Sequence, residues 1–144
     1  MTYDYILPSD NSFYPVSLDE IEEVEATLGL KIPKELRGFY LTVGYGFIKG
    51  SEYNINRIMD PLSVRDFHLR ENDFENYPDI EMFEEVEKDK LVFFEADEST
   101  TILIQMGENE RNQIYLFDMK IADSLEEFLE KILIDDLYYI YLLE

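Results

Sequence analysis

Apolar residues recur at helical spacing twice in succession between positions 16 and 50. Ser17 can cap the first of these helices, and Gly29 stands where its C-terminus needs a residue with a left-handed backbone. Pro33 suits the first turn of the second helix, because the amide hydrogen that proline lacks is unpaired there. The two apolar stripes are Leu18, Ile21, Val24 and Leu28, then Leu36, Phe39, Tyr40 and Val43. The pattern predicts two short helices in tandem that dock onto a sheet.

The second half of the chain contains short apolar runs that are typical of β-strands. Residues 91–94, 101–104 and 114–117 are rich in β-forming side chains and are separated by short polar loops. Two shorter runs, 47–48 and 53–55, follow the helix pair. Because short loops join neighbouring strands, we expect an antiparallel meander in which residues 91–94 form an interior strand.

Further helix starts lie on either side of these strands. Asp60 followed by Pro61 begins one helix, and Ser124 with Glu127 forms a capping box at the start of another. Residues 80–86 have apolar side chains three apart, which allows a short helix. We expect an α+β fold, with an antiparallel or mixed sheet of about five or six strands. The N-terminal helix pair and a C-terminal helix pack against this sheet, and residues 1–144 form a single domain.

The last ten residues, 135–144, are rich in leucine, isoleucine and tyrosine. An apolar segment of this kind does not stay exposed to water. It continues the preceding helix, docks on the domain or contacts a second copy of the chain. The third alternative makes a homo-oligomer through the C-terminal tail one of the states that the sequence allows.

The helix pair also carries a family resemblance. The residues that carry it fall in a fixed order: Glu25, Leu28, Gly29, Ile32, Pro33, Leu36, Phe39 and Gly46. This order is that of a signature that runs roughly Glu-x-x-Leu-Gly-x-x-Leu-Pro, then an aromatic helix, then Asn-Gly-Gly. Ile32 stands where the signature has leucine, and Gly44-Tyr45-Gly46 replaces Asn-Gly-Gly. The signature opens the SUKH superfamily, which this chain resembles and which contains bacterial toxin-immunity proteins and yeast cell-wall synthesis regulators.

The formal net charge of −21, from 33 acidic and 12 basic residues, limits the kinds of partner. Such a field repels phosphate backbones, which argues against nucleic-acid binding. It favours fast, salt-sensitive association with a cationic partner. A solvated acidic surface that only keeps the protein soluble explains the same charge.

Targeting and redox features are sparse. The absence of cysteine excludes disulfides and thiolate metal sites from this sequence. The first residues lack the basic region and the long apolar run of a signal peptide. No stretch is long and apolar enough to span a membrane. We therefore expect a cytoplasmic protein without membrane contact.

The sequence does not predict catalysis. Carboxylates are abundant, but adjacent pairs such as Asp97 and Glu98 point apart on a helix or strand and lack a partner at a required spacing. His68 is the only histidine, and neither a nucleophile elbow nor a glycine-rich phosphate loop is present. We expect no enzyme activity, no metal and no cofactor.

Two residues of the helix pair stand out for structure and for binding. Glu25 lies on the apolar side of the first helix, so we expect its carboxylate to be mostly buried and to accept backbone N–H groups near residues 33–36. Tyr45 stands between two glycines, where it either caps the core or offers an exposed aromatic anchor to a partner. The acidic residues expected to form the partner-binding face with it are Glu81, Glu84, Glu85, Glu87, Asp97 and Glu98.

The resemblance implies a non-enzymatic binding protein that neutralises a cognate toxin by direct contact. Toxins of such systems often attack nucleic acids and so carry basic surfaces, which would complement this acidic chain. The expected partner is therefore a basic toxin domain. The alternative that the resemblance leaves open is a scaffold protein similar to the regulators of cell-wall (glucan) synthesis.

Overall fold

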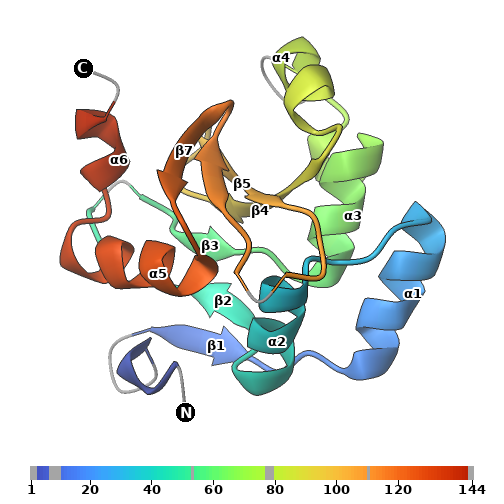
Figure 1. The fold of residues 1–144 in the computed structure, drawn as a ribbon, viewed down its shortest axis with the longest axis horizontal. Coiled ribbons are helices and arrows are strands. Elements are labelled where there is room, and N and C mark those ends of the chain that lie inside the picture. Colours follow the sequence, from blue (N-terminus) through green and yellow to red (C-terminus); the bar gives the residue numbers. More distant parts are fainter. Residues whose placement is uncertain (1–2, 7–10, 53, 77–79, 110, 143–144) are drawn as a thin grey trace.

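Seven strands form one antiparallel sheet in the computed structural model, which describes residues 3–6, 11–52, 54–76, 80–109 and 111–142. The strands lie side by side in the order in which they follow along the chain (Figure 1). They are β1 (Ser12–Tyr14), β2 (Tyr45–Phe47), β3 (Arg57–Ile58), β4 (Lys90–Glu95), β5 (Thr101–Gln105), β6 (Ile114–Leu116) and β7 (Met119–Ala122). The α+β fold and the antiparallel meander are confirmed, with slightly more strands than predicted.

Helices flank the sheet on two sides. The first two, α1 (Leu18–Leu28) and α2 (Lys34–Thr42), are the predicted tandem pair. In Figure 1, α1, α3 and α4 line one flank of the molecule, and α5 and α6 line the other. The remaining helices are α3 (Pro61–Leu69), α4 (Ile80–Val86), α5 (Leu125–Ile134), α6 (Tyr138–Tyr141) and the 3-10 helices η1 (Asp4–Ile6) and η2 (Asn72–Phe74).

Side-chain caps determine where three of these helices begin. The Ser17 hydroxyl accepts the N–H of Glu20 at 3.1 Å, and the Ser124 hydroxyl accepts that of Glu127 at 3.0 Å. Asp60 caps α3 in the same way. All three caps are those that the sequence predicts, and each stabilises its helix by about 1 kcal/mol.

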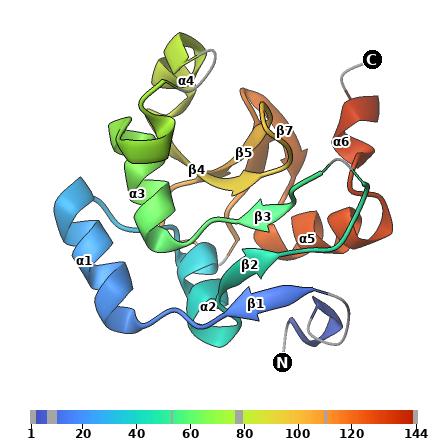
Figure 2. The ribbon, with the colours of Figure 1, turned by 180° about the vertical axis from the view of Figure 1, so that it is seen from behind.

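The middle of the sheet is covered on both faces. The residues from Leu91 to Phe94 in β4 are all buried, although successive side chains in a strand point to opposite faces. The Phe94 ring meets Phe128 of α5 edge to face, with the centroids 5.1 Å apart. The other helix that packs on β4 is α3; α5 is nearer the viewer in Figure 1, and α3 in Figure 2. The prediction that residues 91–94 form an interior strand is confirmed, because β3 and β5 pair with β4.

The turn between α1 and α2 contains the glycine and the proline of the motif. Gly29 ends α1 with a left-handed φ of 70°, and Pro33 is the N-cap of α2 instead of lying in its first turn. Phe39 of α2 then packs edge to face against Tyr3 at 4.9 Å and Phe13 of β1 at 6.0 Å between ring centroids. The helix pair thus ends in a helix that covers one face of β1.

Gly44 and Gly46 allow β2 to approach β1. A Cβ atom at Gly44 would lie 1.9 Å from the carbonyl oxygen of Tyr14, and one at Gly46 would lie 2.0 Å from that of Ser12. Both glycines also have positive φ, 119° and 151°, which disfavours any other residue. Tyr45, which stands between them, therefore lies in a strand and not in the turn that the sequence suggested.

The C-terminal segment docks on the rest of the chain by part of its apolar surface. Tyr139 of α6 is buried, and the Tyr138 hydroxyl donates to the carbonyl oxygen of Ile121 at 2.7 Å. Ile134 and Tyr141 remain 88% and 65% exposed. Docking on the chain is thus the alternative that the structure favours, and an oligomer through this segment stays a prediction.

The strands at the two edges of the sheet were not predicted. β1 lies in the polar lead-in, and β7 follows β6 after a short turn in which Phe117 has a φ of 55°. Strands of three or four residues are too short to show an alternating pattern. Of the predicted run 53–55, Tyr53 lies outside the described residues, and β3 begins only at Arg57.

Candidate partner-binding surface

One face of β1 and β2 exposes three aromatic side chains. Tyr14 is 48% exposed, Phe47 is 41% exposed, and Tyr45 is half-buried. Tyr14 and Tyr45 are cross-strand partners, and their ring centroids lie 5.5 Å apart. We call these three residues the aromatic strip.

The pleat of the two strands directs the aromatic strip away from the core. Phe13 and Gly46, the cross-strand pair next to Tyr14 and Tyr45, belong to the other face, because the Phe13 ring packs on Phe39 of α2. Side chains alternate along a strand, so the aromatic strip shares the opposite, outer face. Figure 2, the view from behind, shows β1 and β2 without a helix across this face.

The first turns of α1 and α3 border the aromatic strip, because β1 leads into α1 and β3 leads into α3. Leu18 and Leu62 in these turns are 44% and 36% exposed. α1 packs on α3, and the charge of Asp60, the N-cap of α3, acts on Glu20 of α1. Burial raises the pKa of Glu20, and the negative charges of Asp60 and Glu23 raise it further. The border is therefore both apolar and acidic.

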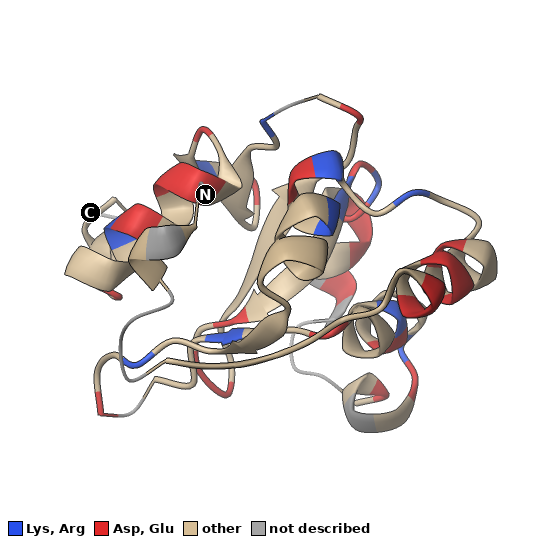
Figure 3. Ribbon diagram, turned by 90° about the horizontal axis from the view of Figure 1, so that it is seen from below, with Lys and Arg blue, Asp and Glu red and all other residues tan. Residues whose placement is uncertain are grey.

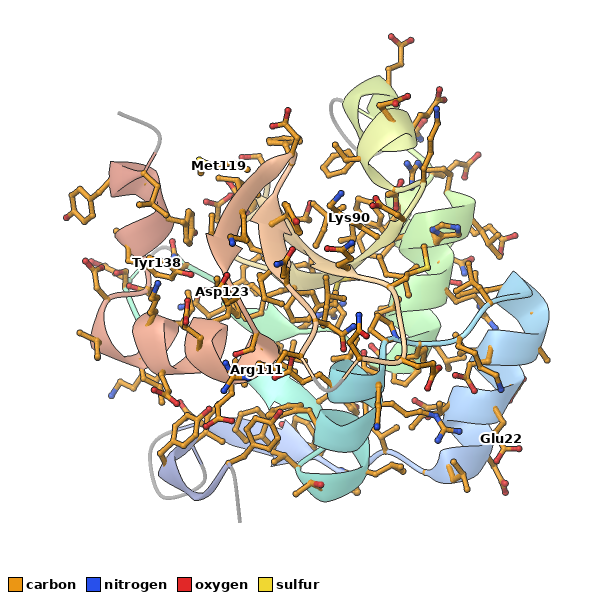
Figure 4. All side chains as sticks on the ribbon, viewed as in Figure 1. Glu22, Lys90, Arg111, Met119, Asp123 and Tyr138 are labelled. Atoms are coloured by element: carbon orange, nitrogen blue, oxygen red, sulfur yellow. The ribbon has the colours of Figure 1, made fainter. Side chains whose placement is uncertain are left out.

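Exposed carboxylates continue along α1. Asp19, Glu22 and Glu23 are exposed and Glu20 is half-buried, and none of them forms an ion pair with another described residue. Figure 3 shows acidic positions along this helix, and in Figure 4 Glu22 points away from the body of the molecule. The charge on α1 is thus negative and without an ion-pair partner among the described residues. The strip's own face also carries a cation, Arg57, which is the cross-strand partner of Phe47 and pairs with Glu95 at 2.9 Å.

Three of the predicted acidic positions lie on α4, away from the aromatic strip. They are Glu81, Glu84 and Glu85, and all three are exposed. Phe83 on the buried side of α4 meets Phe67 of α3, with 5.3 Å between the ring centroids. Phe67 is near the C-terminal end of α3, whereas the aromatic strip lies near its N-terminal end. A helix of nine residues is about 13 Å long, so α4 and Tyr45 are not neighbours.

Glu87 does not belong to the acidic surface, contrary to the prediction. It is 7% exposed, and its carboxylate pairs with the guanidinium of Arg70 at the end of α3. The Nδ1 atom of His68 lies 3.7 Å from the other carboxylate oxygen. Glu87 therefore connects the residues after α4 to α3, and His68 belongs to the same structural cluster.

Asp97 and Glu98 lie in the turn between β4 and β5. The chain comes from α4 into the first residue of β4, whereas the turn with Asp97 and Glu98 follows the last residue of β4. Six strand residues span about 20 Å, so the turn and α4 lie at opposite ends of β4. The structure does not bring the predicted acidic residues together into one face.

Two carboxylates on the helix pair bind backbone donors. The Oε2 atom of Glu25, which is 6% exposed, accepts the N–H of Ile32 at 2.9 Å, one residue before the expected group. The Oε1 atom of Glu35 accepts the N–H groups of Asn112 and Leu125 at 2.8 and 2.9 Å. Glu35 thereby ties α2 to the start of α5.

Asp136 forms a second tie, between the C-terminal segment and the loop after β2. Its carboxylate accepts the N–H and the hydroxyl of Ser51 at 2.7 and 2.6 Å and the Asn56 amide at 2.8 Å. Burial alone would raise the pKa of Asp136, but the hydrogen bonds from Ser51 and Asn56 outweigh it and lower the pKa. A Cβ at Gly50 would lie 2.3 Å from this carboxylate, so the loop needs glycine there. Sequence reasoning missed Glu35 and Asp136, because their partners are 77 to 91 residues away.

The surface has the chemistry of a protein-binding site. Aromatic side chains with acidic neighbours can bury apolar area and attract a cationic group. No group of three or more metal-ligating side chains within the described ranges is placed to hold a metal ion. None of the helices in those ranges has the length and apolarity needed to cross a membrane.

Comparison with known proteins gives two matches. The family model SUKH_6, described as SMI1-KNR4 cell-wall, matches residues 18–129, from the start of α1 into α5. The immunity protein YxxD of Bacillus subtilis (strain 168) is 59% identical over 145 residues, which cover 100% of this chain and 99% of that protein. No solved structure gives a significant match. Because the family model spans most of the chain, including the helix pair with its motif, the chain belongs to the SUKH superfamily.

Proposed function

We propose that this protein is an immunity protein that neutralises a toxin by direct contact, without catalysis of its own. The observation that carries the proposal is the 59% identity to a protein named immunity protein YxxD. The match covers 99% of that relative, so every domain of the relative has a counterpart in this chain. A shared mode of action therefore needs no additional segment in either protein.

The use of the buried carboxylates supports binding over catalysis. Glu25, Glu35 and Asp136 each accept hydrogen bonds from backbone or amide donors of the fold. A carboxylate held in this way stabilises structure and is poorly suited to exchange protons with a substrate. Glu87 pairs with Arg70 in the same structural manner.

We propose a basic toxin surface as the partner and the cytoplasm as the place of encounter. A net charge of −21 accelerates the approach of a cationic protein and makes the approach dependent on salt. The carboxylates proposed to contribute to this attraction are the exposed Glu81, Glu84, Glu85 and Glu98 and the half-buried Asp97. Tyr45 is the proposed anchor, since tyrosine contributes large contact area at a small loss of side-chain entropy.

The proposal predicts that a toxin domain is encoded beside this gene, and that toxin domain is used in the test. Cells that express the toxin domain should stop growing and should recover when this protein is co-expressed. The purified proteins should form a one-to-one complex in size-exclusion chromatography. Recovery without a complex, or a toxin that stays inactive after the complex has been dissociated, would indicate enzymatic inactivation and contradict the proposal.

The family description names cell-wall proteins, and this favours a scaffold in cell-wall synthesis as the second candidate. The two candidates differ in what deletion of the gene does. A strain without the immunity protein should be harmed only when the toxin is present. A strain without a cell-wall scaffold should be sensitive to wall-directed antibiotics even when the toxin gene is also deleted.

A further inference from the structure

We infer that the toxin docks on the aromatic strip and places an arginine side chain against Glu20 and Asp60 at the border of the strip. The inference rests on the proposed function and identifies the contact face and the chemistry of its occupant. It moves the acidic part of the site from α4 and the β4–β5 turn to the first turns of α1 and α3.

The first argument is the uneven covering of the sheet. Both faces of β4 are buried, whereas the outer face of β1 and β2 leaves Tyr14 and Phe47 more than two-fifths exposed. Leu18 and Leu62, in the first turns of the helices that follow β1 and β3, are also exposed. Exposed apolar side chains that adjoin one another on a small protein are typical of an interaction surface.

The second argument is an electrostatic arrangement that is unfavourable in the free protein. Glu20 and Asp60 carry like charges and interact across the gap between α1 and α3, and no described cation pairs with either. Asp60 is retained as a helix cap, because it accepts hydrogen bonds from the N–H and hydroxyl of Ser63. Glu20 contributes no side-chain hydrogen bond among the described residues, so its charge is used only for its favourable position in the first turn of α1.

A partner's arginine would resolve this repulsion. A guanidinium offers several N–H donors in one plane, which suits two neighbouring carboxylates. The same plane stacks on aromatic rings, and Tyr14 and Tyr45 lie at the border with their rings 5.5 Å apart. The site therefore selects a basic protein surface over an apolar one of the same shape.

The other exposed apolar area lacks a comparable pair of carboxylates. Ile134, Ile140 and Tyr141 lie at the end of α5 and on α6. Asp135 and Asp136 accept hydrogen bonds within their own segment or from the loop after β2, and the exposed Glu130 lies one helical turn before Ile134. The aromatic strip is the better candidate because two carboxylates, Glu20 and Asp60, act on each other at its border.

The decisive variant is Glu20→Gln, with Glu130→Gln as its matched control. Both remove one negative charge from a helix, but Glu130 is exposed on α5, on the other flank of the molecule. The binding constant of each variant for the toxin domain is measured by titration calorimetry, and the melting temperature is recorded. Glu20→Gln should weaken binding at least tenfold without lowering the melting temperature, and Glu130→Gln should change binding less than twofold. Tyr14→Ala should weaken binding at least fivefold.

The possible outcomes separate this inference from the proposed function. A wild-type complex that Glu20→Gln and Tyr14→Ala leave unchanged would overturn the contact face while the immunity function stands. Equal weakening by Glu20→Gln and Glu130→Gln would show that only net charge matters, and it would also overturn the contact face. If the wild-type protein restores growth without forming a complex, the direct-contact function and this inference both fail.

Discussion

The centre and the N-terminal edge of the sheet are stabilised in different ways. β4 and β5 are buried on both faces, and aromatic rings such as Phe94 and Phe128 meet there. At the edge, α2 covers only the inner face of β1, while the adjoining loop and helix are fastened by the carboxylates of Asp136 and Glu35. Packing on two faces leaves no free surface, whereas hydrogen-bonded ties hold an edge in place and keep one face available.

The difference shows how a small acidic protein can keep a surface available for binding another protein. The apolar side chains of the centre are shielded from other chains, so they cannot bind a partner. The edge keeps the rings of Tyr14 and Phe47 exposed and that of Tyr45 partly buried, and their acidic neighbours disfavour contact between two copies of the same chain. The following variants test this division, from the largest expected effect to the smallest.

Phe94→Ala should destabilise the protein most, and Phe47→Ala should hardly affect stability. Phe94 is fully buried between β4 and α5, so its removal leaves a cavity and should lower the free energy of unfolding by about 3–5 kcal/mol. Phe47 is 41% exposed on the outer face, and its loss should lower that free energy by less than about 1 kcal/mol. Urea unfolding measures both. Similar losses at the two positions would contradict the division between centre and edge.

Asp136→Ala should loosen the edge and leave the centre packed. The Asn56 amide is buried and would lose its acceptor, which should lower the free energy of unfolding by about 2–3 kcal/mol. Hydrogen exchange should increase in the loop after β2 and not in β4.

The same carboxylate should make stability sensitive to acid. The pKa of Asp136 in the folded protein is below its ordinary value of 3.8, so its stabilisation is complete above that value and is lost as the pH falls through the lower, folded value. Asp136→Asn should therefore remove part of the acid sensitivity below pH 3.8. An Asn variant with the same acid unfolding curve as the wild type would show that other carboxylates dominate.

Tyr45→Ala should affect binding more than stability. An aromatic anchor contributes about 2 kcal/mol, which corresponds to about a 30-fold loss of affinity, expressed mainly as faster dissociation. Surface plasmon resonance against the toxin domain measures the two rates. Tyr45→Phe is the control, since it keeps the ring next to that of Tyr14. A loss of affinity that follows only a fall in melting temperature would place Tyr45 in the core instead.

Lysine at Glu81, Glu84 and Glu85 together should slow association and leave dissociation unchanged. These side chains lie on α4, remote from the aromatic strip, so they act on the partner only through long-range attraction. The association rate should fall about tenfold at low salt and much less at 0.5 M salt, where the screening length is short. A change in the dissociation rate would show that α4 touches the toxin.

Glu20→Gln should slightly increase stability at neutral pH. The folded protein raises the pKa of Glu20 above its ordinary value of 4.5, because of burial, Asp60 and Glu23, so the folded state loses stability as the pH rises through the folded value. Glutamine removes that loss, with a gain of about 0.2–0.5 kcal/mol at pH 7 and none below pH 4.5. Urea unfolding at pH 4 and pH 7 tests the sign. A gain at both values would contradict the electrostatic explanation.

Local signals in the sequence were sufficient for most of the elements. Ser17, Asp60 and Ser124 accept hydrogen bonds from residues three positions further on, so their role depends only on neighbours in the chain. The run 91–94 is apolar at every position, which indicates a strand covered on both faces. Gly29 ends its helix because glycine tolerates a positive φ, which is a property of the residue and not of its distant contacts.

The candidate surface depended on contacts that local signals do not contain. Tyr45 was singled out, but its partner Tyr14 lies in a three-residue strand that has no recognisable pattern. Acidic residues were too abundant for spacing to select Glu20 over Glu87. Only the fold shows that Glu87 faces Arg70, whereas Glu20 faces another carboxylate.

The tie between Glu35 and α5 has a consequence for the timing of protection. The N–H groups that Glu35 accepts belong to Leu125 and Glu126, which are synthesised 90 and 91 residues after it. Ser51 donates to Asp136, which is synthesised later still. At about 5–20 residues per second, a ribosome needs about 7–30 s to complete the chain. A nascent chain cannot close its edge before α5 has emerged, so the proposed immunity should begin only after synthesis is nearly complete. A message cut short before α5 should then yield no protective product, and a cell should need the whole chain before the toxin becomes active.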